Sequence, residues 1–230
     1  MPELMEIVAG DLRFAVWVWQ AVADTEPPAV LLHATGRTGR DWDVIASGLC
    51  HDRRVHAVDL RGHGASDWPG TYRLELFARD VAGILDKLDL GAVDLVGHSL
   101  GGLVACQVAA DRPGHVRRLV LEDIGLPHPR PPSLPARPEG ELPFDWHMVE
   151  QVRPQIDDPD PGWAGIVDRI TAPTLIIAGG DASPVPQEHV AELADRLADA
   201  RLTTIDAGHL VHETAPDAYL RALIPFLTGR

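Results

Sequence analysis

Short apolar runs alternate with longer amphipathic segments along almost the whole chain. Runs rich in valine, leucine and isoleucine predict five buried strands, centred on residues 30–32, 55–58, 95–96, 119–121 and 175–177. Elsewhere apolar residues recur about every 3.6 positions and predict amphipathic helices, most clearly over residues 74–88, 190–197 and 219–226. Because strands and helices alternate, we expect an α/β fold with a mostly parallel central sheet that helices flank on both faces.

Two segments depart from this alternation. From Leu12 to Val18 apolar residues occupy every second position, which predicts an arm of an antiparallel hairpin at the sheet edge. Prolines crowd between residues 125 and 143, so neither helix nor strand is expected there. A short helix is expected to follow at about residues 145–155.

The interruption defines the expected domain organisation. We predict a single domain over residues 1–230, with a small cap insertion at about residues 124–170 that lies over the ends of the strands. Trp146 and Trp163 favour a packed cap over a disordered linker. Together with Trp68, these tryptophans are candidates for the apolar wall of a binding site or for the core.

Charge and composition narrow the possible partners and location. The 230 residues carry a formal net charge of −14, and such a surface repels phosphate backbones, so we expect no nucleic-acid partner. No apolar run approaches the roughly 18 residues of a spanning helix, and the N-terminus lacks the pattern of a secretory leader, so we expect no membrane association. Cys50 and Cys106 are expected to be free, buried thiols, as in a cytoplasmic protein. The pattern predicts no particular oligomeric state.

The segment Gly97–Gly102 reads Gly-His-Ser-Leu-Gly-Gly and carries the clearest chemical signal. It follows the predicted strand that ends at Val96 and opens an apolar helix, which is the context in which Gly-x-Ser-x-Gly forms a nucleophile elbow. Glycines allow the tight turn that exposes the hydroxyl of Ser99, and free N–H groups at the helix N-terminus favour a developing oxyanion. The motif therefore indicates a nucleophilic serine.

With this motif and further segments in the same order, the chain resembles the α/β-hydrolase family over nearly its whole length. Leu31–Gly36 resembles the loop after the third strand of that family, with Ala34 where glycine is usual. The resemblance implies an oxyanion hole formed by the backbone N–H groups of Thr35 and Leu100. Asp59–Ser66 resembles a loop of the family whose polar residues are expected to support the fold and not to react.

The resemblance also implies the general base. Asp206–Glu213 resembles the loop that carries the catalytic histidine, and His209 follows a glycine there. A serine hydroxyl is a poor nucleophile at neutral pH unless an imidazole takes its proton. His209 is therefore expected to be the base and His212 is the nearby alternative, whereas His33 and His98 are expected to be hydrogen-bonding neighbours of the site.

The acid of the triad departs from the usual family pattern. That pattern places the acid after the strand at residues 173–177, but Ala182 occupies the position and Asp181 lies one residue early. Because successive residues point in different directions, a shift of one residue matters. Some members of the family carry the acid after the sixth strand, where the match gives Asp123. We expect Asp123 to be the acid, with Asp181 as the alternative and Glu122 as a more distant one.

Taken together, these resemblances imply a serine hydrolase that cleaves a small-molecule carboxylic ester, lactone or thioester through an acyl-enzyme on Ser99. Amide or peptide cleavage and perhydrolysis are alternatives on the same triad, and a non-catalytic ligand-binding receptor is an alternative of another class. No cofactor is implied. No metal site is expected, because His209 and His212 lie three residues apart without a partner cluster.

Overall fold

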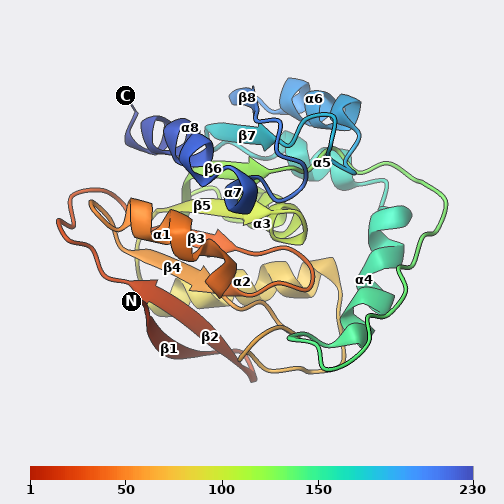
Figure 1. Cartoon of the computed structure of the whole chain (residues 1–230), viewed down its shortest axis with the longest axis horizontal. Coiled ribbons are helices and arrows are strands. Elements are labelled where there is room, and N and C mark those ends of the chain that lie inside the picture. Colours follow the sequence, from red (N-terminus) through yellow and green to blue (C-terminus); the bar gives the residue numbers. More distant parts are fainter. Residues whose placement is uncertain (230) are drawn as a thin grey trace.

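The computed structural model describes residues 1–229. Eight strands form one sheet, in the order β1-β2-β4-β3-β5-β6-β7-β8 (Figure 1). They are β1 (Glu3–Ala9), β2 (Leu12–Trp19), β3 (Ala29–Leu32), β4 (Val55–Val58), β5 (Val93–His98), β6 (Val116–Glu122), β7 (Thr174–Ala178) and β8 (Ala200–Thr204). Strand β2 pairs antiparallel with both β1 and β4, and the other neighbouring pairs are parallel. The predicted mostly parallel sheet with a hairpin at one edge is confirmed.

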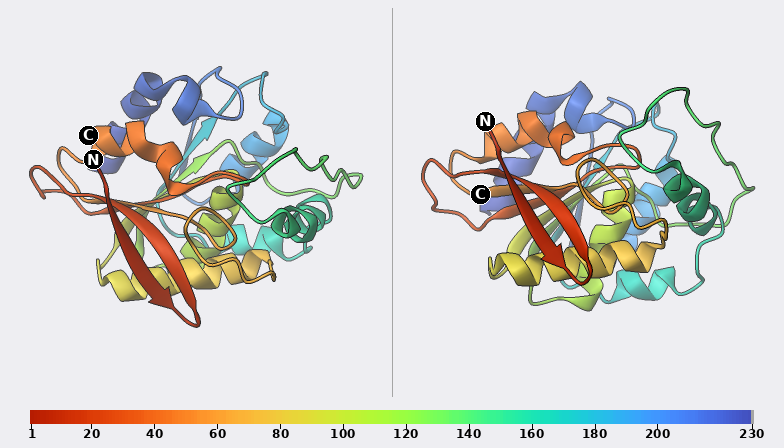
Figure 2. Two further views of the ribbon diagram at one scale, coloured as in Figure 1. Left: turned by 60° about the horizontal axis from the view of Figure 1, so that its bottom comes forward. Right: turned by 90° about the horizontal axis from the view of Figure 1, so that it is seen from below.

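Helices cover both faces of this sheet (Figure 2). They are η1 (Gly39–Trp42), α1 (Asp43–Leu49), α2 (Leu74–Leu88), α3 (Leu100–Asp111), α4 (Trp146–Asp157), α5 (Trp163–Asp168), α6 (Gln187–Arg196), α7 (Val211–Thr214) and α8 (Pro216–Thr228). Apolar side chains of α1 and α8 pack on one face, and those of α2, α3 and α6 pack on the other. Within residues 1–229, no helix is both long enough and apolar enough to cross a membrane.

The apolar pattern of the sequence predicts the buried strands and helices correctly but misses some that are exposed or short. The five predicted strands correspond to β3, β4, β5, β6 and β7, and the three predicted amphipathic helices to α2, α6 and α8. The pattern missed β8, which lies at the sheet edge and buries none of its residues fully. It also missed α5, whose six residues are too few to establish a period.

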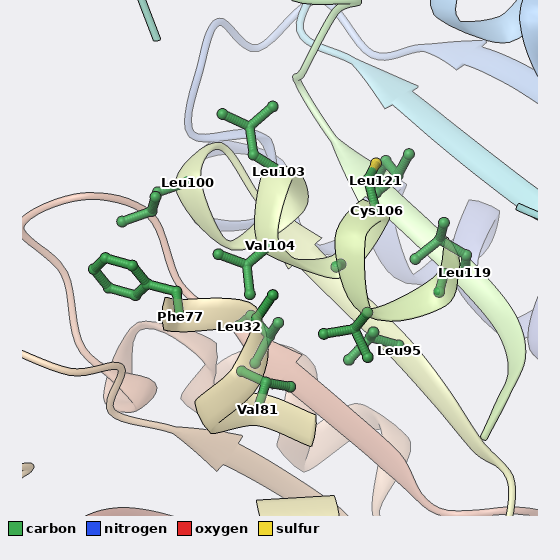
Figure 3. Close-up of a cluster of buried hydrophobic side chains, with 14 of the residues drawn as sticks. Leu32, Phe77, Val81, Leu95, Leu100, Leu103, Val104, Cys106, Leu119 and Leu121 are labelled. Carbon is green, nitrogen blue, oxygen red and sulfur yellow. The ribbon is translucent and has the colours of Figure 1, made fainter. Parts of the chain in front are cut away.

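Helix α3 lies in the middle of the larger core cluster. Figure 3 shows side chains of α2 and of strands β3, β5 and β6 meeting those of α3; the labelled residues are Leu32, Phe77, Val81, Leu95, Leu100, Leu103, Val104, Cys106, Leu119 and Leu121. Every residue of α3 except Gln107 and Asp111 is buried. Each large apolar side chain removed from water contributes about 1.5–3 kcal/mol. This burial fixes α3, and therefore the turn at its N-terminus, against the sheet.

The turn from β5 into α3 leaves no room for side chains at its glycines. A Cβ on Gly101 would lie 2.3 Å from the carbonyl oxygen of Leu32, and a Cβ on Gly97 would meet the carbonyl oxygen of Gly101. Backbone atoms cannot move aside as the tip of a flexible side chain can. Glycine therefore allows the close approach of α3 to β3 that brings Ser99 to the carboxyl end of the sheet.

The segment of residues 124–170 leaves the sheet after β6 and lies at the carboxyl ends of the parallel strands (Figure 2). Residues 125–143 form neither helix nor strand, as their prolines predict, and α4 occupies nearly the predicted helical range. Trp163 is buried and Trp146 is half-buried against the larger core cluster. The tryptophans thus attach this segment, called the cap below, to the body of the protein.

The two cysteines are both free, but they differ in burial. Burial raises the pKa of the Cys106 thiol to about 12, so this residue is an unreactive part of the core. Cys50 is partly exposed, because it lies at the C-terminal cap of α1. The expectation that both thiols are buried is therefore wrong for Cys50.

We predict that Gly101→Ala lowers the free energy of unfolding by about 2–3 kcal/mol, because the new Cβ would overpack against the backbone of β3. Urea unfolding followed by circular dichroism measures the change. The matched control is Gly114→Ala, since no heavy atom lies within 4 Å of a Cβ at that position. Equal stability of the two variants would contradict the close approach.

Candidate active site

Ser99 lies in the turn between β5 and α3 with φ 51° and ψ −115°. A serine rarely adopts a positive φ, so its neighbours must hold this conformation. One such contact is the 3.1 Å hydrogen bond that the Ser99 N–H donates to the carbonyl oxygen of Glu122 at the end of β6. The turn brings Ser99 to the wall of a cavity.

His209 and Asp123 meet at this cavity. Nδ1 of His209 donates a hydrogen bond of 2.6 Å to Oδ2 of Asp123, and Asp123 is fully buried. Its two carboxylate oxygens also accept hydrogen bonds from the Gly179 N–H, at 2.8 Å, and from the Ser183 hydroxyl, at 2.5 Å. Burial raises the pKa of Asp123, but the hydrogen bonds from His209, Ser183 and Gly179 outweigh burial and leave the pKa below its usual value. The carboxylate therefore stays charged beside the imidazole.

The alternative acid lies elsewhere. Asp181 is exposed and, within residues 1–229, makes no hydrogen bond with His209. Ser183, two positions further on, is the residue of this turn that reaches Asp123. Sequence reasoning missed Ser183, because 60 positions separate it from its partner and no motif marks it.

Glu122, the third candidate for the acid, pairs with His212 and not with His209. Nδ1 of His212 lies 2.8 Å from both carboxylate oxygens, and the His212 backbone N–H donates to Oε1 at 3.0 Å. Glu122 is fully buried, which by itself raises its pKa, but the neighbouring His98 and His212 lower the pKa below its ordinary value. Burial lowers the pKa of His98 to about 4, so the His98 ring is neutral at neutral pH. The pair ties the loop of His209 to the end of β6.

His98, Glu122 and His212 also form a group that could hold a metal ion, with potential ligand atoms within 4.8 Å of one another. The sequence argument against a metal site did not identify this group, which includes His212 but not His209. It failed because the fold joins residues from β5, β6 and α7. The three side chains are buried, and Glu122 already accepts two hydrogen bonds from His212. A cation would have to displace that pairing.

Two buried histidines hold the loop that carries Thr35. Nδ1 of His33 donates to the carbonyl oxygen of Ala34 at 2.7 Å, and the Gly36 N–H donates to Nε2 of His63 at 3.1 Å. Both neighbours of Thr35 are thus anchored. The N–H groups of Thr35 and Leu100 donate no hydrogen bond to a protein acceptor in the described part of the chain, and both residues line the cavity.

These hydrogen bonds also define the protonation of His33 and His63. Nε2 of His33 accepts a hydrogen bond from the Leu60 N–H at 3.0 Å, so Nε2 must be unprotonated. Nδ1 of His63 donates to the carbonyl oxygen of Arg61 at 2.9 Å, and its Nε2 likewise accepts. Burial lowers the pKa of His33 to about 4 and that of His63 to about 3. Both rings are neutral structural groups.

The loop that follows β4 has the expected supporting role. Oδ1 of Asp59 accepts a hydrogen bond from the Gly39 N–H at 2.7 Å, and Oδ2 accepts one from the Ala65 N–H at 3.0 Å. Arg61 forms a buried ion pair with Asp80 on α2. These contacts join the loop to neighbouring backbone and to α2.

A cavity of about 520 Å³ opens in front of Ser99, Thr35, Leu100 and His209. Its apolar wall includes Leu103, Ile124, Leu126, Met148, Val149, Val152, Ile156 and Val185. In the described structure none of the three tryptophans lines it; Trp163 is buried in the core and Trp68 is largely exposed. The suggestion of a tryptophan wall is therefore wrong. No hydrogen bond joins the Ser99 hydroxyl to the His209 ring among residues 1–229, and catalytic hydrogen bonds are often long until substrate binds.

Comparison with known proteins defines the family. Residues 27–148, more than half of the chain, match the family model described as alpha/beta hydrolase fold. With the sheet order and the turn at Ser99, this match shows that the chain belongs to the α/β-hydrolase fold family.

Individual relatives add detail. The chain is 38% identical to a 3-hydroxybutyrate-oligomer hydrolase of Cupriavidus necator over 122 residues, which are 51% of this chain and 41% of that protein. It is 37% identical to an esterase of Mycobacterium tuberculosis over 126 residues, 54% of this chain and 40% of that protein. The match thus spans about two fifths of these relatives. A hydrolase from Pseudomonas aeruginosa PA01 superimposes over 99% of both chains, with a TM-score of 0.84 and 26% identity.

We predict that the protein loses stability as the pH falls from about 6.5 towards 4. The unfolded chain protonates His33 and His63 near pH 6.5, whereas the folded state does so only near pH 4 and pH 3, so their stabilising contribution is complete above pH 6.5. The loss should be roughly 1.4 kcal/mol per pH unit for each histidine within this window. Urea unfolding at several pH values measures it.

Two variants control for other titrating groups. His33→Gln should reduce the slope by roughly 1.4 kcal/mol per pH unit, because His56, His63 and His98 still have lowered pKa values, whereas His51→Gln, at an exposed position, should leave the slope unchanged. An unfolding free energy that stays constant between about pH 6.5 and 5 would contradict the assignment of neutral buried rings.

Proposed function

We propose that the protein is a serine hydrolase that cleaves a carboxylic ester, lactone or thioester of small size through an acyl-enzyme on Ser99. The observation that carries the proposal is the 2.6 Å contact between His209 and the buried Asp123 at the cavity that Ser99 lines. An imidazole that donates from Nδ1 to a carboxylate has Nε2 free to accept a proton. Membership of the α/β-hydrolase fold family and the similarity to an esterase support the same reaction class.

The proposed reaction has two halves. In the first, Ser99 Oγ bonds to the carbonyl carbon while its proton passes to Nε2 of His209, and the N–H groups of Thr35 and Leu100 stabilise the oxyanion. The bond to the leaving alcohol or thiol then breaks, and that group takes the proton from His209. In the second half, a water molecule gives a proton to His209 and bonds to the acyl carbon, and Ser99 departs with the proton.

Asp123 is proposed to orient His209 and to stabilise its charged form. Three hydrogen bonds keep the carboxylate ionised, so a positive charge on the imidazole has a fixed partner at the moment the proton is transferred. This pair supports an enzyme over a non-catalytic receptor, because it supplies an acid although Ala182 occupies the usual acid position. Amide cleavage and perhydrolysis use the same groups, and no contact described above favours them over ester cleavage.

We predict that p-nitrophenyl acetate and butyrate are hydrolysed by the wild type and that Ser99→Ala falls to the background rate. Removal of the nucleophile should lower kcat by several orders of magnitude, because no other group in the mechanism can form the acyl-enzyme. Release of p-nitrophenol measures the rate, and unfolding in urea shows whether the variant is folded. Equal rates for the two proteins would refute the role of Ser99.

A second prediction separates the two candidate acids. Asp123→Asn should lower kcat by about four orders of magnitude. The neutral amide lacks the negative charge that stabilises the protonated ring of His209, and it favours the wrong tautomer of that ring. Asp181→Asn, at an exposed position, should stay within a few-fold of wild type. The matched pair is compared with one ester at saturating concentration. The reverse order of effects would assign the acid to Asp181.

A further inference from the structure

The cap carries two arginines on the wall of the cavity, Arg130 in the proline-rich segment and Arg153 on α4. Both reach the same carboxylate oxygen: Nε of Arg130 lies 2.6 Å and Nε of Arg153 lies 2.8 Å from Oδ1 of Asp157. Asp157 is 2% exposed, whereas the two arginine side chains keep 42% and 30% of their surface. The guanidinium groups are thus held side by side by one buried acid.

Further contacts fix this arrangement. The Arg130 N–H donates to the carbonyl oxygen of Asp157 at 2.8 Å, and Oδ2 of Asp157 accepts from the Ser133 N–H at 2.9 Å. Asp157 therefore joins the proline-rich segment to the end of α4. Both arginines use Nε for this, and within residues 1–229 their Nη groups donate no hydrogen bond to protein. Those Nη groups are the edge with which arginine binds carboxylate or phosphate in pairs of hydrogen bonds.

The charges around the cavity are unbalanced. Its charged lining consists of Arg37, Arg130, Arg153 and Asp123 in addition to histidines. Arg37 is neutralised by Asp41 and Glu213, and Asp123 faces His209. Two guanidinium groups that share one carboxylate leave about one positive charge on the wall, in a chain whose net charge is −14. The net negative charge of the protein repels anions, so the positive charge of the two arginines attracts an anion only close to the cavity.

We propose that Arg130 and Arg153 form an anion subsite, and that the preferred substrate is an ester or thioester that carries a carboxylate or phosphate remote from the bond that is cleaved. Apolar side chains of α4 line the same cavity, including Met148, Val149 and Val152, so the substrate contains an apolar stretch as well. The inference rests on the proposed function of Ser99, because it assigns the substrate of that site.

The experiment compares charged and neutral substrates in pairs. The p-nitrophenyl monoesters of glutaric and adipic acid are set against p-nitrophenyl pentanoate and hexanoate, and butyryl-coenzyme A against the neutral thioester of butyrate with N-acetylcysteamine. We expect the charged member of at least one pair to have a kcat/KM at least about tenfold higher, since a charge-assisted hydrogen bond is worth this much or more. A preference for the charged member of the first two pairs would indicate that the subsite binds a carboxylate. A preference for butyryl-coenzyme A would indicate that it binds a phosphate.

Variants assign any preference to the subsite. Arg130→Gln and Arg153→Gln, each as a single variant, should abolish the preference through KM and leave kcat/KM for the neutral esters within about twofold. Each single variant keeps one arginine on Asp157, which preserves the fold. The matched control is Arg196→Gln, at 36% exposure with one acidic partner on α5, which should retain the preference. High salt should weaken the preference.

Three outcomes would each overturn one of the proposals. Neutral esters that are cleaved in a Ser99-dependent manner, without any preference for the charged members, would overturn the anion subsite alone. The subsite would also fall if the Arg130 and Arg153 variants lowered turnover of charged and neutral esters equally. Absence of Ser99-dependent cleavage of every substrate in the set would overturn the proposed function itself.

Discussion

The edge of the sheet that carries the candidate active site depends on two consecutive buried carboxylates at the end of β6. Glu122 binds His212 and Asp123 binds His209, so one loop is held at two points. Successive side chains of a strand point to opposite faces, but Asp123 has a φ of 46°, which turns the chain where the strand ends. A buried carboxylate without a partner costs several kcal/mol, so the end of β6 and the histidine loop stabilise each other.

The same principle of mutual anchoring extends to the other two loops of the site. The turn of Ser99 is tied to Glu122 through its backbone N–H, and the loop of Thr35 is tied to His33 and His63. Neutral histidines suit the second task, because each ring donates from one nitrogen and accepts at the other. Groups fixed in this way need little reorganisation when charge develops on a substrate oxygen.

Different interactions hold the cap and the edge of the sheet that carries the candidate active site. Proline limits the conformations of residues 125–143 without hydrogen-bonded secondary structure, and Asp157 supplies the tether that joins this segment to α4. Buried Asp157 and the apolar side of α4 hold the segment in place, whereas the exposed guanidinium edges face the cavity. In the proposed reaction, the body of the fold provides the reacting groups, and the cap provides part of the surface that contacts the substrate.

The sequence by itself determined the features that depend on near neighbours in the chain. Apolar runs and periods identified the strands, the edge hairpin and the main helices, because burial of one face requires a regular local pattern. Gly97 to Gly102 identified the turn of Ser99, since its shape depends on the glycines within it. The same local rule explains why exposed β8 and short α5 were missed.

The tertiary structure alone decided which distant side chains meet. His209 and Asp123 are 86 positions apart, and Arg130 and Asp157 are 27 apart. The family resemblance favours Asp123 over Asp181 but fixes no contact, and the tertiary structure brings Asp123 within hydrogen-bond distance of His209 and of Ser183 in the turn after β7. Such contacts depend on the paths of the loops and on the order of the strands in the sheet. Neither produces a periodic pattern in the sequence.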